Sequence, residues 1–216
     1  GNHLYSYNGY FLMDTSVDDI GTPVYIESYF PYSTFDGIPT NPLLLAKFTE
    51  DIDPLSLQPG VIYLEDLGNN SEQVPLTYQM GTNSRIIEVR PDVELTPGNG
   101  YYLRFTNAIK DTDGDSLGST YTNYFVVAED GVRDDRQPVA SNFSPPVGEN
   151  GVGINAEFSV QFDEAINPIS FVHDQAVNIQ FSTDNRTVKY NRFEPLPPSQ
   201  QHTEQLPLVI DMSGNQ

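Results

Sequence analysis

Three aspartates stand at alternate positions in the stretch DTDGDS, at Asp111, Asp113 and Asp115. Carboxylate oxygens with this spacing can converge on one hard cation, and Ca²⁺ is the usual occupant. A calcium loop of the EF-hand type also needs Gly at its sixth position and Glu at its twelfth, where this chain has Ser116 and Thr122. The other interpretation is a tight Asp-Gly hairpin turn with solvated acids. The stretch therefore predicts either a calcium site or a plain turn.

Two other acidic stretches offer oxygen ligands. FTEDIDP contains Glu50, Asp51 and Asp53, and EDGVRDDRQP contains Glu129, Asp130, Asp134 and Asp135. Calcium in the second stretch would stiffen a joint between two domains. Arg133 and Arg136 can instead neutralise the acids there through ordinary ion pairs, and an Asp before a Pro can simply hold a turn.

The residue types of common catalytic sites are absent or scattered. The chain has no Cys, and His3, His173 and His202 fall in different predicted segments without the spacing of metal ligands. Neither a P-loop nor a G-x-S-x-G spacing occurs. We therefore expect no enzymatic activity.

Aromatic residues crowd the stretch YIESYFPYSTF, which contains Tyr25, Tyr29, Phe30, Tyr32 and Phe35. Exposed rings at this density can stack on sugar faces and form a glycan-binding platform. The other interpretation is that the rings fill one end of a core or an interface with a preceding domain.

Charge and composition restrict the partners. The chain has 30 acidic and 10 basic residues among 216, a net charge of −20. A field of this sign repels nucleic acid and anionic membranes. No apolar run approaches the roughly 18 residues that a membrane span needs, and the absence of Cys excludes disulfides. We expect no nucleic-acid partner and no membrane insertion.

The elements that position these groups are indicated by an internal repeat. The decapeptide FTEDIDPLSL begins at Phe48, and FDEAINPISF begins at Phe162. We expect the two phenylalanines to be inward anchors at a strand end, and Pro54 and Pro168 to stop sheet pairing there. A structural role at the end of a strand therefore explains why the decapeptide occurs twice, and no catalytic or metal-binding role is needed.

The repeat also extends backwards, because YFLMDTSVDDIGTPV before the first copy is similar to YFVVAEDGVRDDRQPV before the second. A period of this size is that of a domain with its own core. The predicted division is the last strand of a preceding repeat at 1–16, a linker at 17–22, a complete domain at 23–129, a linker at 130–137, and a second, C-terminally incomplete domain at 138–216.

Within 23–129, short apolar runs alternate with turn signals. Strands are predicted at 24–29, 43–48, 61–66, 74–80, 85–89 and 101–105 and from 121 onward, with one helical turn at 54–57 capped by Asp53. This pattern is typical of an all-β, antiparallel β-sandwich. The spacing of Leu95, Pro97 and Tyr101 in LTPGNGY predicts a tyrosine corner, in which the hydroxyl bonds to backbone just upstream.

In this order, the motifs resemble the bacterial Ig-like domains grouped as Big_5. The motifs are the Pro-Val strand leading to GIPTN or GVGIN, the strand ending FTEDIDP or FDEAINP, the LTPGNGYYLRF corner and the hairpin IKDTDGDSLGSTYTNYF. The resemblance covers 23–129 and the first half of the pattern in 138–216. It implies tandem Ig-like β-sandwiches.

The chain departs from the family pattern after Tyr190, where a Pro-rich stretch lacks a second tyrosine corner and a second Asp-Gly hairpin. We therefore expect an open sheet edge and less well ordered residues at 186–216. The strand predicted at 5–13 is a candidate to fill that edge.

The resemblance implies a non-catalytic spacer of a bacterial cell-surface or secreted multidomain protein, related to adhesion and located outside the cell. Its partners would be neighbouring Ig-like repeats of the same longer chain. The alternative is a ligand-binding module for a glycan or a surface protein, stiffened by Ca²⁺. Apart from that cation, no cofactor is expected.

Overall fold

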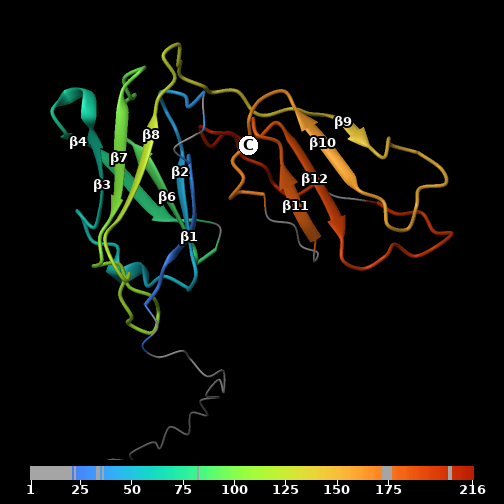
Figure 1. The fold of residues 1–216 in the computed structure, drawn as a ribbon, viewed down its shortest axis with the longest axis horizontal. Helices are drawn as coiled ribbons and strands as arrows, with labels where there is room; N and C mark the ends of the chain where they lie inside the picture. Colours follow the sequence, from blue (N-terminus) through green and yellow to red (C-terminus); the bar gives the residue numbers. More distant parts are fainter. Residues whose placement is uncertain are drawn as a thin grey trace, which may run out of the picture.

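The computed structural model describes residues 21, 23–32, 35, 37–81, 83–171, 177–203 and 206–216. Figure 1 shows two bodies of β-structure side by side, with the C-terminal end of the chain between them. We call residues 23–129 the first unit, residues 130–137 the linker and residues 138–216 the second unit.

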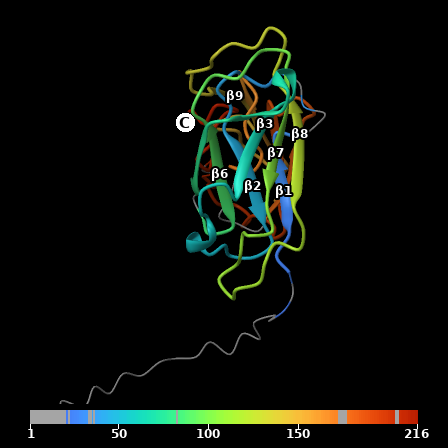
Figure 2. The ribbon, with the colours of Figure 1, turned by 90° about the vertical axis from the view of Figure 1, so that its left-hand side faces the viewer.

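The first unit is a sandwich of two antiparallel sheets. Its strands are β1 (Ile26–Phe30), β2 (Leu44–Phe48), β3 (Ile62–Asp66), β4 (Glu72–Val74), β5 (Leu76–Met80), β6 (Ile86–Pro91), β7 (Gly100–Phe105) and β8 (Tyr121–Val126). One sheet has the order β1-β2-β6-β5 and the other β4-β3-β7-β8. Figure 2 labels β1, β2 and β6 of the first sheet and β3, β7 and β8 of the second. The expectation of an all-β antiparallel sandwich is therefore confirmed.

In the part of the chain that the structure describes, helical structure is confined to short segments. The described residues form two 3-10 helices, η1 (Pro54–Ser56) and η2 (Leu67–Asn69). In the described part of the chain, no helix combines the length and the apolar character needed to cross a bilayer.

Alternating side chains on β7 show how the two sheets meet. Tyr101, Leu103 and Phe105 are at most 1% exposed, while the residues between them are only partly buried. The ring of Phe105 meets that of Phe48 from the opposite sheet edge-on, at 6.1 Å between centroids. Successive side chains of a strand point to opposite faces, so one inward row from each sheet fills the core.

The strand expected at 74–80 is interrupted at Pro75. Before this proline, β4 pairs with β3, and after it β5 pairs with β6 in the other sheet. Proline cannot donate a backbone hydrogen bond and so ends a ladder. One apolar run in the sequence thus supplies an edge strand to each sheet.

The described residues of the second unit form one sheet. Its strands are β9 (Ala140–Ser144), β10 (Phe158–Phe162), β11 (Val177–Phe181) and β12 (Thr187–Arg192), in the order β11-β12-β10-β9. The sheet has the same strand order as the β5-β6-β2-β1 sheet of the first unit, with β9, β10, β11 and β12 in the places of β1, β2, β5 and β6. A separate core packs on it, formed by Val160, Phe162, Ile166, Phe171, Val188 and Tyr190.

The C-terminal part of the chain contributes a central strand. Within the stretch 186–216, whose lower order stays a prediction, β12 pairs with β10 on one side and β11 on the other. The central position of β12 in the sheet satisfies its backbone on both edges. The strand predicted at 5–13 lies outside the described residues.

The repeated decapeptide begins at the last residue of a strand in both units, at Phe48 of β2 and at Phe162 of β10. The N–H of Phe48 donates to the carbonyl of Arg85 at 2.7 Å, and the N–H of Phe162 donates to the carbonyl of Arg186 at 2.8 Å. Both rings are buried, at 0% and 4% exposure. The two phenylalanines thus occupy matching surroundings.

The turn after each of these phenylalanines is also built alike. Asp53 Oδ1 accepts the N–H of Leu55 at 2.9 Å, and Asn167 Oδ1 accepts the N–H of Ile169 at 3.2 Å. In the first unit, this cap begins η1, as expected for the 54–57 turn. The repeated sequence therefore forms the same strand end and the same turn in both units.

Candidate functional site

The three aspartates at alternate positions form a turn. Asp111 is buried, and its Oδ1 accepts the backbone N–H groups of Asp113 at 3.0 Å and Asp115 at 2.8 Å. Asp115 Oδ2 accepts the N–H of Gly21 at 2.8 Å. Among the described residues, the three acids whose oxygens can share one ion lie elsewhere.

The acids of the first decapeptide have structural partners. Asp51 accepts hydrogen bonds from Ser84 Oγ at 2.6 Å and from Arg85 Nε at 3.3 Å. The Ser84 hydrogen bond, followed by the Arg85 guanidinium, lowers the pKa of Asp51. Glu50 lies 3.8 Å from the Arg85 guanidinium. This stretch is therefore an exposed ion-pair group beside a turn.

A second turn of the Asp111 kind closes the chain at 211–215, where no Asp-Gly hairpin was expected. Asp211 Oδ1 accepts the N–H groups of Ser213 and Asn215, both at 2.8 Å. Asp211 also forms an isolated bridge with Ile166. The sequence has no Asp-Gly pair here, and the Pro-rich stretch before residue 209 separates this turn from the landmarks that precede its counterpart.

The C-terminal turn docks on the first unit. The N–H of Leu43 donates to the carbonyl of Met212 at 2.8 Å, and Arg90 Nη1 donates to the carbonyl of Ser213 at 2.8 Å. The Met212 side chain is 5% exposed and belongs to the first unit's core. Ile210 packs with Leu43 in a small apolar cluster between the units.

Two asparagines hold the linker against this turn. Asn41 Nδ2 donates to the carbonyl of Asp134, and the N–H of Asp134 donates back to Asn41 Oδ1, each at 2.9 Å. Asn215 Nδ2 lies 3.1 Å from the same carbonyl and 2.8 Å from Asp211 Oδ2. These bonds place one linker carboxylate beside the turn.

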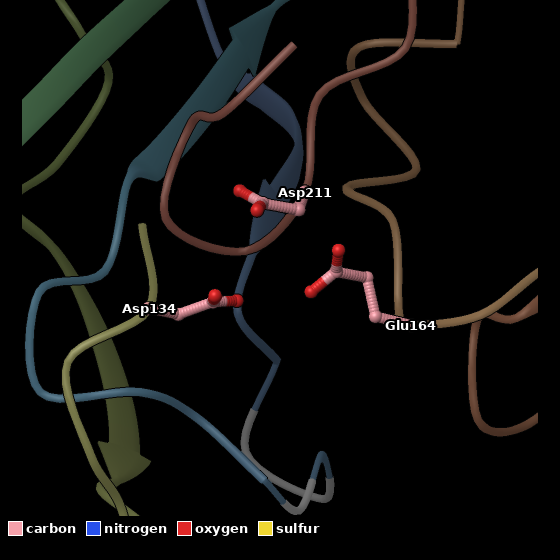
Figure 3. A group of neighbouring side chains, drawn as sticks. All are labelled: Asp134, Glu164 and Asp211. Carbon is pink, nitrogen blue, oxygen red and sulfur yellow. The ribbon is translucent and has the colours of Figure 1, made fainter. Parts of the chain in front are cut away.

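Three carboxylates meet at this junction (Figure 3). Asp134 comes from the linker, Glu164 follows β10, and Asp211 begins the C-terminal turn. One oxygen of each lies within 4.8 Å of the others. Glu164 is 8% exposed and Asp211 is 0% exposed. The Asp134 and Glu164 side chains point toward each other, and Asp211 lies beside them (Figure 3), so three separate segments of the chain bring these acids together.

The charges of this acidic junction are poorly balanced. The nearest described cation is Arg136, whose Nη2 lies 3.8 Å from Glu164 Oε2 and whose side chain is 70% exposed. Glu164 Oε1 is buried and has no hydrogen-bond partner. Burial, with the adjacent Asp134 and Asp211 carboxylates, raises the pKa of Glu164 to about 7. Burial also raises the pKa of Asp211, against its hydrogen bonds from Asn215 and Ser213.

Such an arrangement can do one of two things. Carboxylates in a buried group of like charge can share a proton, because one charge is thereby removed. They can equally bind a hard divalent cation, which supplies the missing positive charge.

From the sequence, Asp134 was a candidate ligand in the predicted linker, and Glu164 was only one residue of the second decapeptide. Asp211 was not predicted to be part of a site. The missed signal is IDMSGN near the C-terminus, which repeats the Asp-x-x-Gly pattern of KDTDGD. Residues far apart in the sequence form the group, so no local spacing could reveal it.

The remaining residues singled out from the sequence lie in the framework. The Tyr101 hydroxyl accepts the N–H of Thr96 at 2.8 Å and donates to Asp66 Oδ2 at 3.3 Å. Leu95 is 3% exposed, and its N–H donates to the carbonyl of Thr40. The tyrosine therefore bonds to backbone five residues upstream, which is the geometry expected of a tyrosine corner.

The aromatic stretch mostly packs inward. Phe30 and Phe35 are 1% and 7% exposed, with their ring centroids 5.3 Å apart. Tyr29 and Tyr32 are half-buried against the same core, whereas Tyr25 is 54% exposed. Most of these rings are therefore unavailable as a sugar platform.

Comparison with known proteins gives a family match. Residues 20–127, half of the chain, match the family described as bacterial Ig-like domain, Big_5. No curated protein matches the chain.

Solved structures similar to the chain include two of the S-layer protein SbsC. The crystal structure of rSbsC(31-844) has 15% identity and a TM-score of 0.40, over 74% of this chain and 20% of that one. The N-terminal part of SbsC has 14% identity and a TM-score of 0.39, over 82% and 43%. The native conformation of E. coli alpha-2-macroglobulin has 14% identity and a TM-score of 0.38, over 69% and 9%. The chain thus spans less than half the length of each, and similarity at this level carries no further argument.

Proposed function

The chain belongs to the bacterial Ig-like domain family, and from that membership we propose that it is a non-catalytic structural module of a bacterial cell-surface or secreted multidomain protein. Its role is to extend that protein and to fix the direction of the chain from one domain to the next. Its partners are neighbouring Ig-like repeats of the same longer chain.

The observation that carries this proposal is the duplicated framework on the two sides of one docked joint. Strand order, the decapeptide hydrogen bonds and the Asp-x-x-Gly turn recur in both units. This recurrence supports tandem copies of one Ig-like unit, with a domain at 23–129 and a second one at 138–216. The second copy has the first sheet and lacks a counterpart of the β4-β3-β7-β8 sheet among the described residues.

The joint supports a spacer with a defined bend. The C-terminal turn of the second unit places Met212 in the core of the first. Its position is fixed by two hydrogen bonds from the first unit, one donated by the N–H of Leu43 to the carbonyl of Met212 and one donated by Arg90 Nη1 to the carbonyl of Ser213. A linker without such contacts would leave the units free to reorient, which is the default behaviour of joined domains.

Protease treatment of intact bacteria that produce the protein, with the culture medium probed alongside the cells, tests the location. Antibodies against the purified chain should detect fragments released from whole cells, because a surface module is accessible from outside. Protection of the chain until the cells are lysed would contradict the proposal.

The second candidate function is binding of a glycan or a surface protein, favoured by the exposed ring of Tyr25. A glycan array probed with the purified chain decides between the two. The spacer proposal expects no specific signal, whereas binding that Tyr25→Ala abolishes would favour a binding module.

A further inference from the structure

We propose that Asp134, Glu164 and Asp211 form a Ca²⁺ site that locks the joint between the two units. The site is distinct from the Asp111 turn and uses one carboxylate from the linker and two from the second unit. Only the consequence of binding, a stiffer joint, rests on the proposed function. The binding of Ca²⁺ itself does not depend on that function.

The distances fit a single cation. The three oxygens lie within 4.8 Å of one another. Oxygen ligands sit about 2.3 to 2.6 Å from Ca²⁺, so two ligands of one ion can be separated by at most about 5 Å. All three carboxylates can therefore reach the same ion with the backbone in its present position.

An unpartnered oxygen points to a missing ligand. Glu164 is 8% exposed, its Oε1 is buried without a hydrogen-bond partner, and its carboxylate is directed toward Asp134 and Asp211 (Figure 3). A buried polar atom without a partner costs free energy. A cation between the three groups would satisfy this oxygen and offset the repulsion among the carboxylates.

The ligand set selects the class of metal. All three side chains offer oxygen alone, which favours Ca²⁺ or Mg²⁺ over zinc or copper. They come from a linker, a strand end and a turn, and Ca²⁺ accepts irregular geometry more readily than Mg²⁺, which demands near-octahedral ligands. Ca²⁺ is therefore the expected occupant.

The first unit supplies a natural control. Glu50 occupies the position in the first decapeptide that Glu164 occupies in the second. Its carboxylate is 55% exposed and lies near the Arg85 guanidinium instead of other acids. Glu50→Gln thus removes the same charge from the matching place without touching the junction.

Calorimetric titration of the chelator-treated 216-residue chain with CaCl₂, near pH 7.5, tests the site. We expect one Ca²⁺ per chain, a rise in the unfolding temperature with about 1 mM CaCl₂, and a much smaller response to MgCl₂. Glu164→Gln and the linker variant Asp134→Asn should each weaken binding by about tenfold or more. Glu50→Gln and Asp113→Asn should bind as the unmodified chain does.

Three results would overturn the site: no binding at about 5 mM CaCl₂, which is above the range of extracellular calcium modules; unchanged affinity in both junction variants; or loss of binding in Asp113→Asn. If Glu164→Gln does not fold, Asp134→Asn still decides the matter, because Asp134 is only half-buried. A chain that binds no Ca²⁺ yet keeps a fixed distance between spin labels on its two units would end the calcium proposal and leave the spacer proposal standing.

Discussion

Tyr101 connects three parts of the first unit at a single buried point, two through its hydroxyl and one through its ring. It accepts from the Thr96 backbone and donates to Asp66, while its ring stacks on Phe125 at 5.5 Å between centroids. The sequence predicted the backbone bond because the L-x-P-x-x-x-Y spacing is local. It did not predict Asp66, whose position depends on the pairing of β3 with β7.

Tyr101→Phe should lower the free energy of unfolding by about 1 to 2 kcal/mol, because the Thr96 N–H and the Asp66 carboxylate lose a buried partner. Chemical denaturation measures this loss. Tyr124→Phe is the matched control: Tyr124 is 40% exposed, so the change should stay within about 0.5 kcal/mol. Equal effects of the two substitutions would contradict the role assigned to the Tyr101 hydroxyl.

Glu164 gives the metal-free chain a pH-dependent stability. Its pKa is about 7 in the folded chain against an ordinary 4.5, so the folded state holds a proton that the unfolded chain releases. This stabilisation is complete below pH 4.5 and is lost as the pH rises through 7.

With a chelator present, the unmodified chain should therefore lose stability relative to Glu164→Gln between about pH 5 and pH 8, by about 1 to 3 kcal/mol. Urea denaturation of both proteins at the two pH values measures the difference. Parallel pH profiles would show that the carboxyl group titrates in the fold as it does in the unfolded chain.

The Asp-x-x-Gly turn is the element that links the two units. In the first unit it closes a hairpin beside η1, and in the second it docks on the neighbouring sandwich. The sequence predicted the strands of the first sandwich, because alternation and turn residues are local signals. It merged β4 and β5, since an apolar run does not reveal a change of sheet at Pro75.

Gly114 and Gly214 allow the docking role of this element to be measured. Both have positive φ, at +96° and +86°, so alanine costs about 1 kcal/mol of backbone strain at either position. A Cβ at Gly114 would meet no atom within 4 Å, whereas one at Gly214 would overlap the Arg90 guanidinium that bonds to Ser213.

Gly214→Ala should therefore lower the unfolding temperature clearly more than Gly114→Ala, as followed by circular dichroism. The reverse order, or an equal loss, would mean that the C-terminal turn does not rest on Arg90 in solution.

At the scale of the whole molecule, a chain with a net charge of −20 brings two units together through an apolar contact bordered by three acids. The repeat indicated two domains, but nothing in the sequence indicated their relative orientation. We ascribe that orientation to Met212. In the sequence this residue is a lone apolar side chain among the polar residues DMSGNQ, and in the structure it packs in the core of the first unit. Contacts of this kind follow from tertiary packing and have no periodicity to detect.

The most direct test of a fixed joint is the distance between spin labels at Thr77→Cys in the first unit and Asn191→Cys in the second, since the chain has no native Cys. Both positions are exposed. Pulsed electron resonance should give one narrow distance distribution, which Met212→Ala broadens and Leu208→Ala, at a residue 62% exposed, leaves unchanged. A broad distribution in the chain with Met212 intact would show that the two units move independently and would contradict the account.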